Sequence, residues 1–299
     1  MDTAYRYRLL AVFTKSAREG NPLAVFPSAD GFSVDLMQRI AADLDLSETV
    51  FLVRTDDPRA VARARIFTPQ RELDFAGHPT IGSAFVLFYE RSLPETFAIE
   101  ENVGLVPIEV DADERGDTRF WLTTPQIEFF ETLEPETVAT LLDIPLEDLE
   151  PTAPPRFVSA GSPLLFVCLR SPAAVDRATL RQEHLPDAIG SEGSVGAFVF
   201  ARKEPASATC FDVYSRMFAP QTGIPEDPAT GGATGPLAAY MLRYGLLPPR
   251  DGVAFTSEQG TKMGRKSFLH VRVGVHCDRT TIRVGGSAVL VREETWPAR

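Results

Sequence analysis

The sequence has few of the residues that bind metals or form covalent cross-links. Its 299 residues include three cysteines and four histidines. Cys168, Cys210 and Cys277 are odd in number and widely separated, and none belongs to a C-x-x-C pair. We therefore predict neither a disulfide framework nor a zinc site, and expect reduced, mostly buried thiols.

Long apolar runs and basic clusters are also missing. The longest apolar stretch, Ile81–Tyr89, is far too short to cross a bilayer. Residues 1–13 lack the basic start and long apolar core of a secretory signal, so a cytoplasmic protein is expected. The net charge of −11 argues against nucleic-acid and membrane partners. The densest basic group, Lys262, Arg265 and Lys266, is typical of a solvated turn.

Two short motifs occur once in each half of the chain, in the same order. The pattern G-[NS]-P-L begins at Gly20 and again at Gly161, and R-[IM]-F-[TA]-P-Q begins at Arg65 and again at Arg216. Duplication of a whole lobe explains the repeated motifs better than coincidence does. The repeat spans roughly half of the chain, which is too long for a solenoid.

The duplication predicts two lobes, residues 1–118 and 119–299, which face each other across one active site. A last strand near 281–291 is expected to cross back to the first lobe. The charged run Asp111–Arg119 is predicted to be a hairpin tip at the boundary.

The hydrophobic pattern predicts strand, strand, helix, strand, strand, helix in both halves. In the first half, strands are expected near 5–13, 22–27, 48–53 and 62–69, and helices near 33–43 and 79–91. In the second half, strands are expected near 156–160, 163–169, 195–202 and 208–219, and helices near 173–182 and 231–244. Ser33 is the expected N-cap of the first helix, and Gly245 is expected to end the last one.

A glycine-rich turn begins the final helix of each half. The turns are Asp74–Gly82 (DFAGHPTIG) and Glu226–Pro236 (EDPATGGATGP). A helix N-terminus presents unpaired N–H groups to an anion, and glycines let a ligand approach closely. Two such turns predict a clamp for a small carboxylate or phosphate, although the glycines could serve only tight helix packing.

Neither turn has a nucleotide-binding pattern. Both lack the G-x-G-x-x-G order and the lysine of a P-loop. The stretch Gly260–Ser267 looks like a P-loop but is one residue short between its glycines. It lies between two strand-like runs, so a hairpin turn is expected there.

Three side chains are candidates for acid–base chemistry, and each also has an ordinary explanation. Glu48 stands at a strand edge, where a solvated charge is common. Asp227 precedes a proline at a helix start, where an N-cap would account for it. His78 could be a capping or packing residue. Residue types alone leave both interpretations open for all three.

Six motifs together resemble the phenazine-biosynthesis isomerase family, the PhzF-like proteins. They are GNPLAVF at 20–26, SETVF at 47–51, RIFTPQ at 65–70, AGHPTIG at 76–82, EDPATGGATGPL at 226–237 and EQGTKMGR at 258–265. The resemblance implies an α+β fold of the diaminopimelate-epimerase type, in which each of two pseudo-symmetric lobes has a curled β-sheet around a central helix. It also implies a homodimer.

The resemblance assigns roles to the three candidate groups. The glutamate of the S-E-T motif, Glu48, would act as the acid/base. The histidine of G-H-P, His78, and the aspartate of D-P-A-T-G, Asp227, would support it. Glu48 has no evident counterpart in the second half, so the site is expected to be symmetric for binding and asymmetric for chemistry.

The resemblance also assigns substrate-binding residues. Asn21 would lie near the substrate, and Gly77, Gly231 and Gly232 would supply backbone donors to its carboxylate. Phenazine-type sequences usually have serine at the position of Gly232. This departure places the phenazine precursor itself in doubt as the substrate.

The expected function is a cofactor-independent isomerase that moves a proton within a small carboxylate-bearing substrate. The phenazine enzyme of the family does this on dihydro-3-hydroxyanthranilate. Racemases of the wider fold use a cysteine pair in the two glycine-rich turns, and this chain has none there.

Two alternatives belong to other functional classes. One is a non-catalytic metabolite-binding or scaffold protein that retains the fold. The other is a metal-dependent hydrolase that uses His78 and Asp227, although the four histidines show no ligand spacing.

Overall fold

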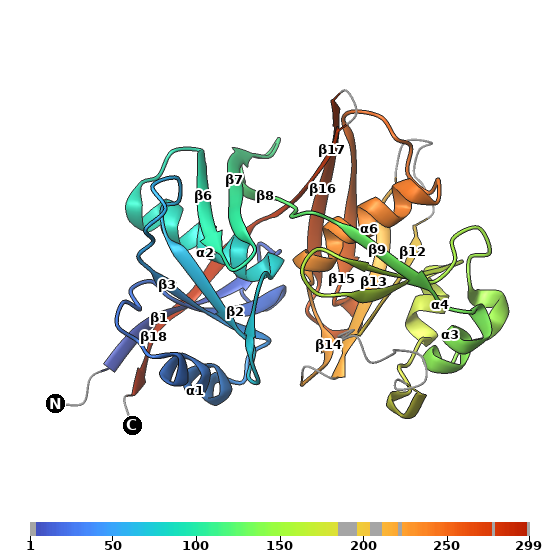
Figure 1. Cartoon of the computed structure of the whole chain (residues 1–299), viewed down its shortest axis with the longest axis horizontal. Helices are drawn as coiled ribbons and strands as arrows, with labels where there is room; N and C mark the ends of the chain where they lie inside the picture. The colour runs from blue at the N-terminus through green and yellow to red at the C-terminus, as the bar shows by residue number, and fades with distance from the viewer. Residues whose placement is uncertain (1–3, 185–195, 204–210, 221–222, 277–278, 298–299) are drawn as a thin grey trace. The chain divides into compact units, whose positions relative to one another are not determined.

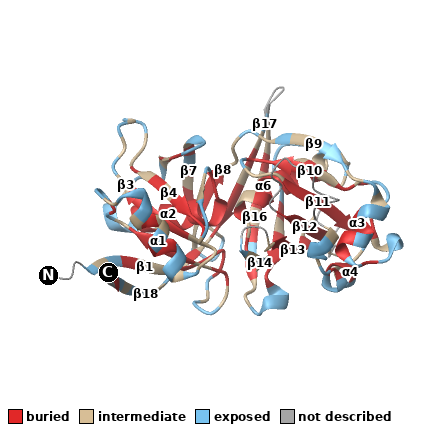
Figure 2. Cartoon of the chain, turned by 60° about the horizontal axis from the view of Figure 1, so that its bottom comes forward, coloured by how far each residue is buried: buried red, intermediate tan, exposed pale blue. Residues whose placement is uncertain are grey.

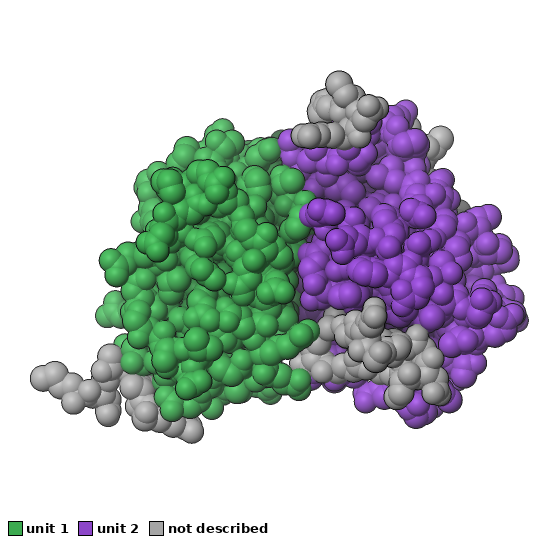
Figure 3. Space-filling view, in the orientation of Figure 1, with its two compact units in different colours: residues 1–125, 284–299 green, residues 126–283 purple. Residues whose placement is uncertain are grey.

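The computed structural model describes residues 4–184, 196–203, 211–220, 223–276 and 279–297. Cys210, Gln221 and Cys277, together with residues 195 and 208–210 of two expected strands, lie outside these ranges. The chain forms two compact units, residues 1–125 with 284–299 and residues 126–283 (Figure 3). The lobe boundary expected between residues 118 and 119 stays a prediction.

The first unit contains eight strands paired in the order β18-β1-β2-β3-β4-β6-β7-β8, with two helices and a short additional strand, β5. The elements are β1 (Ala4–Val12), β2 (Asn21–Phe26), α1 (Val34–Leu44), β3 (Glu48–Val53), β4 (Arg63–Phe67), β5 (Glu72–Leu73), α2 (Gly77–Arg91), β6 (Thr96–Glu101), β7 (Gly104–Ala112), β8 (Thr118–Thr123) and β18 (Ala288–Pro297). Figure 1 shows them from blue to cyan-green, with red β18 beside β1.

The second unit pairs its strands in the order β9-β10-β11-β12-β13-β15-β16, and β14 pairs with β13. The elements are β9 (Glu128–Thr132), α3 (Pro135–Leu142), η1 (Leu146–Asp148), β10 (Arg156–Ser159), β11 (Leu164–Leu169), α4 (Pro172–Arg177), η2 (Gln182–His184), β12 (Ala197–Arg202), β13 (Val213–Ala219), β14 (Ile224–Asp227), α6 (Gly231–Arg243), β15 (Val253–Gln259), η4 (Thr261–Met263) and β16 (Ser267–His276). β17 (Arg279–Gly286) follows it in the chain.

The strand directions confirm the internal repeat. In the first unit β2 runs parallel to β3 and β4 parallel to β6, with antiparallel pairing between β3 and β4. In the second unit β11 runs parallel to β12 and β13 parallel to β15, with antiparallel pairing between β12 and β13. The helices α2 and α6 therefore occupy equivalent places, each between the two strands of the second parallel pair.

The repeat extends to side chains in the R-[IM]-F motif. Arg65 donates two hydrogen bonds to Glu72, at 2.8 and 2.6 Å, and lies over the ring of Phe67. Arg216 makes the same paired contact with Glu226, at 2.8 Å for both bonds, over the ring of Phe218. Paired arginine–carboxylate bonds of this kind hold the turn that precedes each central helix.

The central helices are buried because they are apolar on nearly all sides. Figure 2 colours most of α2 and α6 as buried, in agreement with their side-chain exposure. Gly82 of α2 lies so close to β2 that an added Cβ would be 2.2 Å from Leu23 Cδ2. This glycine therefore serves tight packing, the alternative considered for the glycine-rich turns.

Both expected helix-end signals are confirmed, but one helix is shorter than expected and another was not expected. Ser33 Oγ accepts a hydrogen bond from the N–H of Leu36 at 3.2 Å, which makes it the N-cap of α1. The helix expected at 173–182 ends at Arg177, because Arg216 Nη1 bonds the carbonyls of Val175 and Ala178 from outside the helix. The unexpected helix is α3, which has a proline at its first position.

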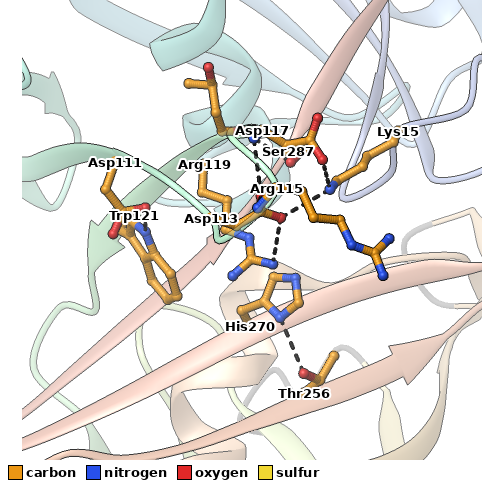
Figure 4. A network of polar contacts seen from close by, with 11 residues as sticks. Lys15, Asp111, Asp113, Arg115, Asp117, Arg119, Trp121, Thr256, His270 and Ser287 are labelled. Carbon is orange, nitrogen blue, oxygen red and sulfur yellow. Dashed lines mark hydrogen bonds and ion pairs between the residues drawn. The ribbon is translucent and has the colours of Figure 1, made fainter.

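The charged run 111–119 forms the β7–β8 hairpin tip, as expected. Asp113 accepts the backbone N–H groups of Arg115 and Asp117 and contacts the side chains of Lys15 and Arg119 (Figure 4). This network ties the hairpin to the turn after β1.

The end of the chain returns to the first unit. The strand that returns is β18, which pairs antiparallel with β1 from Ala4 opposite Pro297 to Val12 opposite Ala288. The strand expected over 281–291 is two strands, β17 and β18, separated at Ser287. The carbonyl of Ser287 accepts the N–H of Phe13 at 2.8 Å. Among the helices of the described ranges, none is long and apolar enough to cross a membrane.

Candidate active site

The strand register of the first unit places Asn21 and Glu48 on one face of the sheet. Asn21 begins β2 and Glu48 begins β3, and Leu23 is the residue that pairs with Glu48. Because alternate side chains along a strand share a face, Asn21 and Leu23 lie on the side where Leu23 meets Gly82 of α2. Glu48, paired with Leu23, points to that side as well.

Three of the expected site residues meet on this face at the start of α2. Asn21 Nδ2 lies 3.2 Å from His78 Nδ1, and His78 Nε2 lies 3.3 Å from Glu48 Oε2. The side chain of His78 is 3% exposed and that of Glu48 is 13% exposed. Glu48 is therefore the member of the group that a ligand could reach.

The hydrogen-bond donors determine the tautomer of His78. An amide NH₂ group can only donate, so Nδ1 of the ring accepts from Asn21 and the ring proton resides on Nε2. Burial lowers the pKa of His78 to about 3, so the ring is neutral near pH 7. The contact with Glu48 is thus between a neutral N–H and a carboxyl group, at ion-pair distance but outside hydrogen-bond alignment.

Gly20 explains why the G-N-P-L motif places Asn21 so closely. Its φ of +68° lies in the left-handed region, and an added Cβ would be 2.4 Å from both the carbonyl oxygen of Val12 and Cγ2 of Thr14. Only glycine fits at position 20, and the turn that it allows places Asn21 at the first position of β2.

The start of α2 adds backbone donors to the cluster. Gly77 is the first residue of the helix, and the N–H of Thr80 makes the first bond back into it, to the carbonyl of Ala76 at 3.1 Å. The N–H groups of Gly77 and His78 therefore precede the intrahelical ladder, at the positive end of the helix dipole. The binding role expected for Gly77 stays a prediction.

A second buried carboxyl group, which the motifs did not reveal, also contacts the first turn of α2. Glu101 ends β6 and is 2% exposed, and its Oε1 lies 2.6 Å from Thr80 Oγ1. Thr80 Oγ1 also lies 2.8 Å from the carbonyl of Ala76, yet a hydroxyl has a single proton. A protonated Glu101 that donates to Thr80 satisfies both contacts. Burial raises the pKa of Glu101 to about 8, in agreement with this protonation.

Asp227, Gly231 and Gly232 lie in the second unit, at the start of α6. Asp227 ends β14 and is buried, and Gly231 and Gly232 are the first two residues of the helix. The N-cap of α6 is Thr230, so the N-cap role considered for Asp227 is not found. Instead, the hydroxyl of Thr230 donates to Asp227 Oδ2.

The expected site residues thus form two groups. Glu48, His78, Asn21 and Gly77 come together in the first unit, and Asp227, Gly231 and Gly232 come together in the second.

The histidine side chains that the structure describes do not belong to a metal-ligand cluster. His270 of β16 contacts Thr256, with Nδ1 and Oγ1 3.2 Å apart (Figure 4). Within the ranges that the structure describes, no three His, Cys, Asp or Glu side chains form a cluster that could hold a metal ion. Cys168, the described cysteine, is a buried free thiol as expected.

Comparison with known proteins places the chain in a family. The family model described as phenazine biosynthesis-like protein matches residues 10–294. An uncharacterized isomerase of Pasteurella multocida is 34% identical over 292 residues, covering 97% of this chain and 93% of that protein. The trans-2,3-dihydro-3-hydroxyanthranilate isomerase of Pseudomonas aeruginosa is 30% identical over 290 residues, covering 97% and 98%.

Solved structures agree with the sequence comparisons. The PhzF-family phenazine biosynthesis protein of Bacillus anthracis has a TM-score of 0.87 at 25% identity, and covers 98% of this chain and 99% of its own. A hydroxyproline epimerase of Agrobacterium vitis shares the fold alone, with a TM-score of 0.60 at 15% identity over 99% and 94% of the two chains. The α+β, diaminopimelate-epimerase-like fold expected from the sequence is confirmed, and the chain is an isomerase of the phenazine biosynthesis-like (PhzF) protein family.

Proposed function

We propose that the protein is a cofactor-independent isomerase that moves a proton within a small carboxylate-bearing substrate, with Glu48 as the acid/base. The observation that carries the proposal is the Asn21–His78–Glu48 array. It leaves the carboxyl group of Glu48 as the accessible end of an otherwise buried cluster.

The proposed reaction needs one carboxyl group. Glu48 in its ionised form takes a proton from a carbon of the substrate, and the resulting carboxylic acid returns it to another carbon, so no electrons leave the substrate. The neutral Nε2–H of His78 lies 3.3 Å from Glu48 Oε2, and we propose that it orients this carboxyl group during the transfer. Asp227 is assigned to the same reaction by the family resemblance.

Helix starts are the proposed binding groups. The N–H groups at Gly77 in α2, and at Gly231 and Gly232 in α6, have no carbonyl partner within their helices. They suit the substrate carboxylate and the negative charge that builds up as the proton leaves carbon. Asn21, whose amide bonds His78, is proposed to lie at the edge of the same site.

The relative from Pseudomonas aeruginosa is named for trans-2,3-dihydro-3-hydroxyanthranilate, and this compound is the natural first probe. Glycine at position 232 lacks the hydroxyl usual in phenazine-type sequences, so we propose a related small carboxylate as the preferred substrate. A homodimer, implied by the same resemblance, is part of the proposal.

The test is proton exchange. The protein in D₂O is expected to incorporate deuterium from solvent into its substrate. The substrate is sought by screening small unsaturated carboxylates, with trans-2,3-dihydro-3-hydroxyanthranilate as the first probe. Glu48→Gln removes the group that carries the proton and is expected to lower the rate by at least about 10³-fold.

The control variant is Glu95→Gln, which makes the same chemical change at an exposed glutamate of the same unit. It should keep the full rate, and circular dichroism should show that both variants are folded. Full exchange activity in folded Glu48→Gln would show that another group carries the proton.

A further inference from the structure

Gln259 is the last residue of β15, is fully buried, and uses its whole side-chain amide on the turn that carries Asp227. Its Oε1 accepts the N–H of Thr230 at 3.1 Å. Its Nε2 donates to the carbonyl of Asp227 at 2.8 Å and to Thr230 Oγ1 at 2.9 Å. Both amide protons and the carbonyl oxygen therefore contact two residues of the D-P-A-T turn.

These contacts determine the direction of the Thr230 hydroxyl. Because the amide nitrogen of Gln259 can only donate, Thr230 Oγ1 must accept from it. The single hydroxyl proton is then available for Asp227 Oδ2, its other contact. The result is an ordered chain from Gln259 through Thr230 to the carboxylate of Asp227.

The residues on either side of Gln259 hold it rigidly. Gly260 has a φ of +75°, and an added Cβ would be 2.6 Å from the carbonyl oxygen of Pro228 and 2.4 Å from that of Arg265. Glu258, 8% exposed, contacts Lys203, Lys266 and Thr261. The E-Q-G motif is therefore packed against the D-P-A-T turn.

The internal repeat supplies independent support. β6 and β15 are equivalent strands, each parallel to the strand that precedes the central helix of its unit. Their last residues are Glu101 and Gln259. Glu101 contacts Thr80, the fourth residue of α2, and Gln259 contacts Thr230, the N-cap of α6. A protonated carboxyl group can donate as an amide does, so both units brace the helix start from the same strand position.

We propose that Gln259 is a positioning residue for the reaction, which acts through the Thr230 hydroxyl to hold the carboxylate of Asp227 in its ionised form and in place. This inference rests on the proposed function in one respect, namely that Asp227 takes part in the isomerase reaction.

The first experiment needs no substrate. The Cγ chemical shift of Asp227, assigned with Asp227→Asn, is followed against pH by ¹³C NMR in the full-length protein. Thr230→Val removes the hydroxyl donor and is expected to raise the titration midpoint of Asp227 by about one pH unit, because a hydrogen bond to a charged group favours that charge. Thr230→Ser keeps the donor and should restore the original midpoint.

Gln259→Met is expected to raise the midpoint as well, but not in a Thr230→Val background, because Gln259 acts through that hydroxyl. A general structural role would give additive shifts in the double variant. The matched control is Thr234→Val, which removes a hydroxyl that donates to the carbonyl of Thr230, four residues earlier in the chain. It should leave the midpoint unchanged.

Unchanged midpoints in both Thr230→Val and Gln259→Met would overturn the proposal, as would additive shifts. If Gln259→Met does not fold, the Thr230→Val and Thr230→Ser pair still decides whether the hydroxyl acts on Asp227. A wild-type protein without exchange activity would contradict the proposed function, while the titrations would still test the position of Gln259.

Discussion

At the scale of single residues, the tautomer of His78 is the feature on which the proposed chemistry depends. A ring with its proton on Nδ1 would turn a lone pair, in place of an N–H, toward the carboxylate of Glu48. The amide of Asn21 prevents this because it donates to Nδ1. Asn21, expected near the substrate, thus also has a role in orienting His78.

This leads to a prediction for ¹⁵N NMR of the His78 ring. Burial lowers the pKa of His78 to about 3, so between pH 5 and 8 the wild type should show one neutral form with the proton on Nε2. Asn21→Leu removes the donor at nearly constant volume, and the ring should then populate both tautomers. The rate at which the protein exchanges deuterium into its substrate should fall by about 10-fold or more. The reason is that a hydrogen bond such as the one from Asn21 to His78 contributes about 1.5 kcal/mol. A protonated ring at pH 5, or an unchanged tautomer in Asn21→Leu, would contradict the assignment.

At the scale of elements, the start of α2 is held by a neutral carboxylic acid. Glu101 contacts Thr80 from the end of β6, and its pKa is raised by burial from the ordinary 4.5 to about 8. The folded protein therefore binds this proton more tightly than the unfolded chain. The contribution to stability is fully present below about pH 4.5 and is lost as the pH rises to about 8.

Glu101→Gln should remove this pH dependence. The glutamine amide can donate to Thr80 as the acid does, and it does not titrate. Denaturant unfolding at pH 5 and pH 8 should show the wild type losing about 3–5 kcal/mol more than the variant over this interval. Equal losses in both proteins would show that Glu101 is ionised in the folded state at neutral pH.

At the scale of the whole molecule, the two ends of the chain complete the first unit together. Trp296 on β18 is 5% exposed and packs against Tyr5 of β1, with Arg39 of α1 over its ring. The unit that holds Glu48 and His78 therefore depends on a strand more than two hundred residues after them in the sequence, whereas the second unit is continuous.

Trp296→Ala is expected to destabilise the protein by about 3–5 kcal/mol, since it leaves a large cavity beside β1. Hydrogen exchange should accelerate in residues 4–125 and change little in 126–283. The control is Leu290→Ala on the same strand, where the side chain is 46% exposed and the cost should stay below about 0.5 kcal/mol. Equal acceleration in both units would show that they unfold as one.

The strands and central helices were predictable because their hydrophobic patterns are local and strong. Ser33 and the glycine-rich turns likewise have signals within a few residues. The short helix α4 was overestimated because its end depends on Arg216, some forty residues later in the chain. A contact between residues so far apart in the chain cannot be predicted from the local hydrophobic pattern.

For the candidate site, the sequence determined which residues were candidates. The glycine-rich turns predicted anion binding, and the resemblance to the phenazine-biosynthesis isomerase family pointed to Glu48, His78, Asp227 and Asn21. The tertiary structure alone decided which of them lie together. The register of β2 and β3 brings Asn21 and Glu48 to His78, and burial makes that histidine neutral. The positions of Glu101 and Gln259 emerged only from the fold, because burial and hydrogen-bond direction depend on atoms that are distant in the chain.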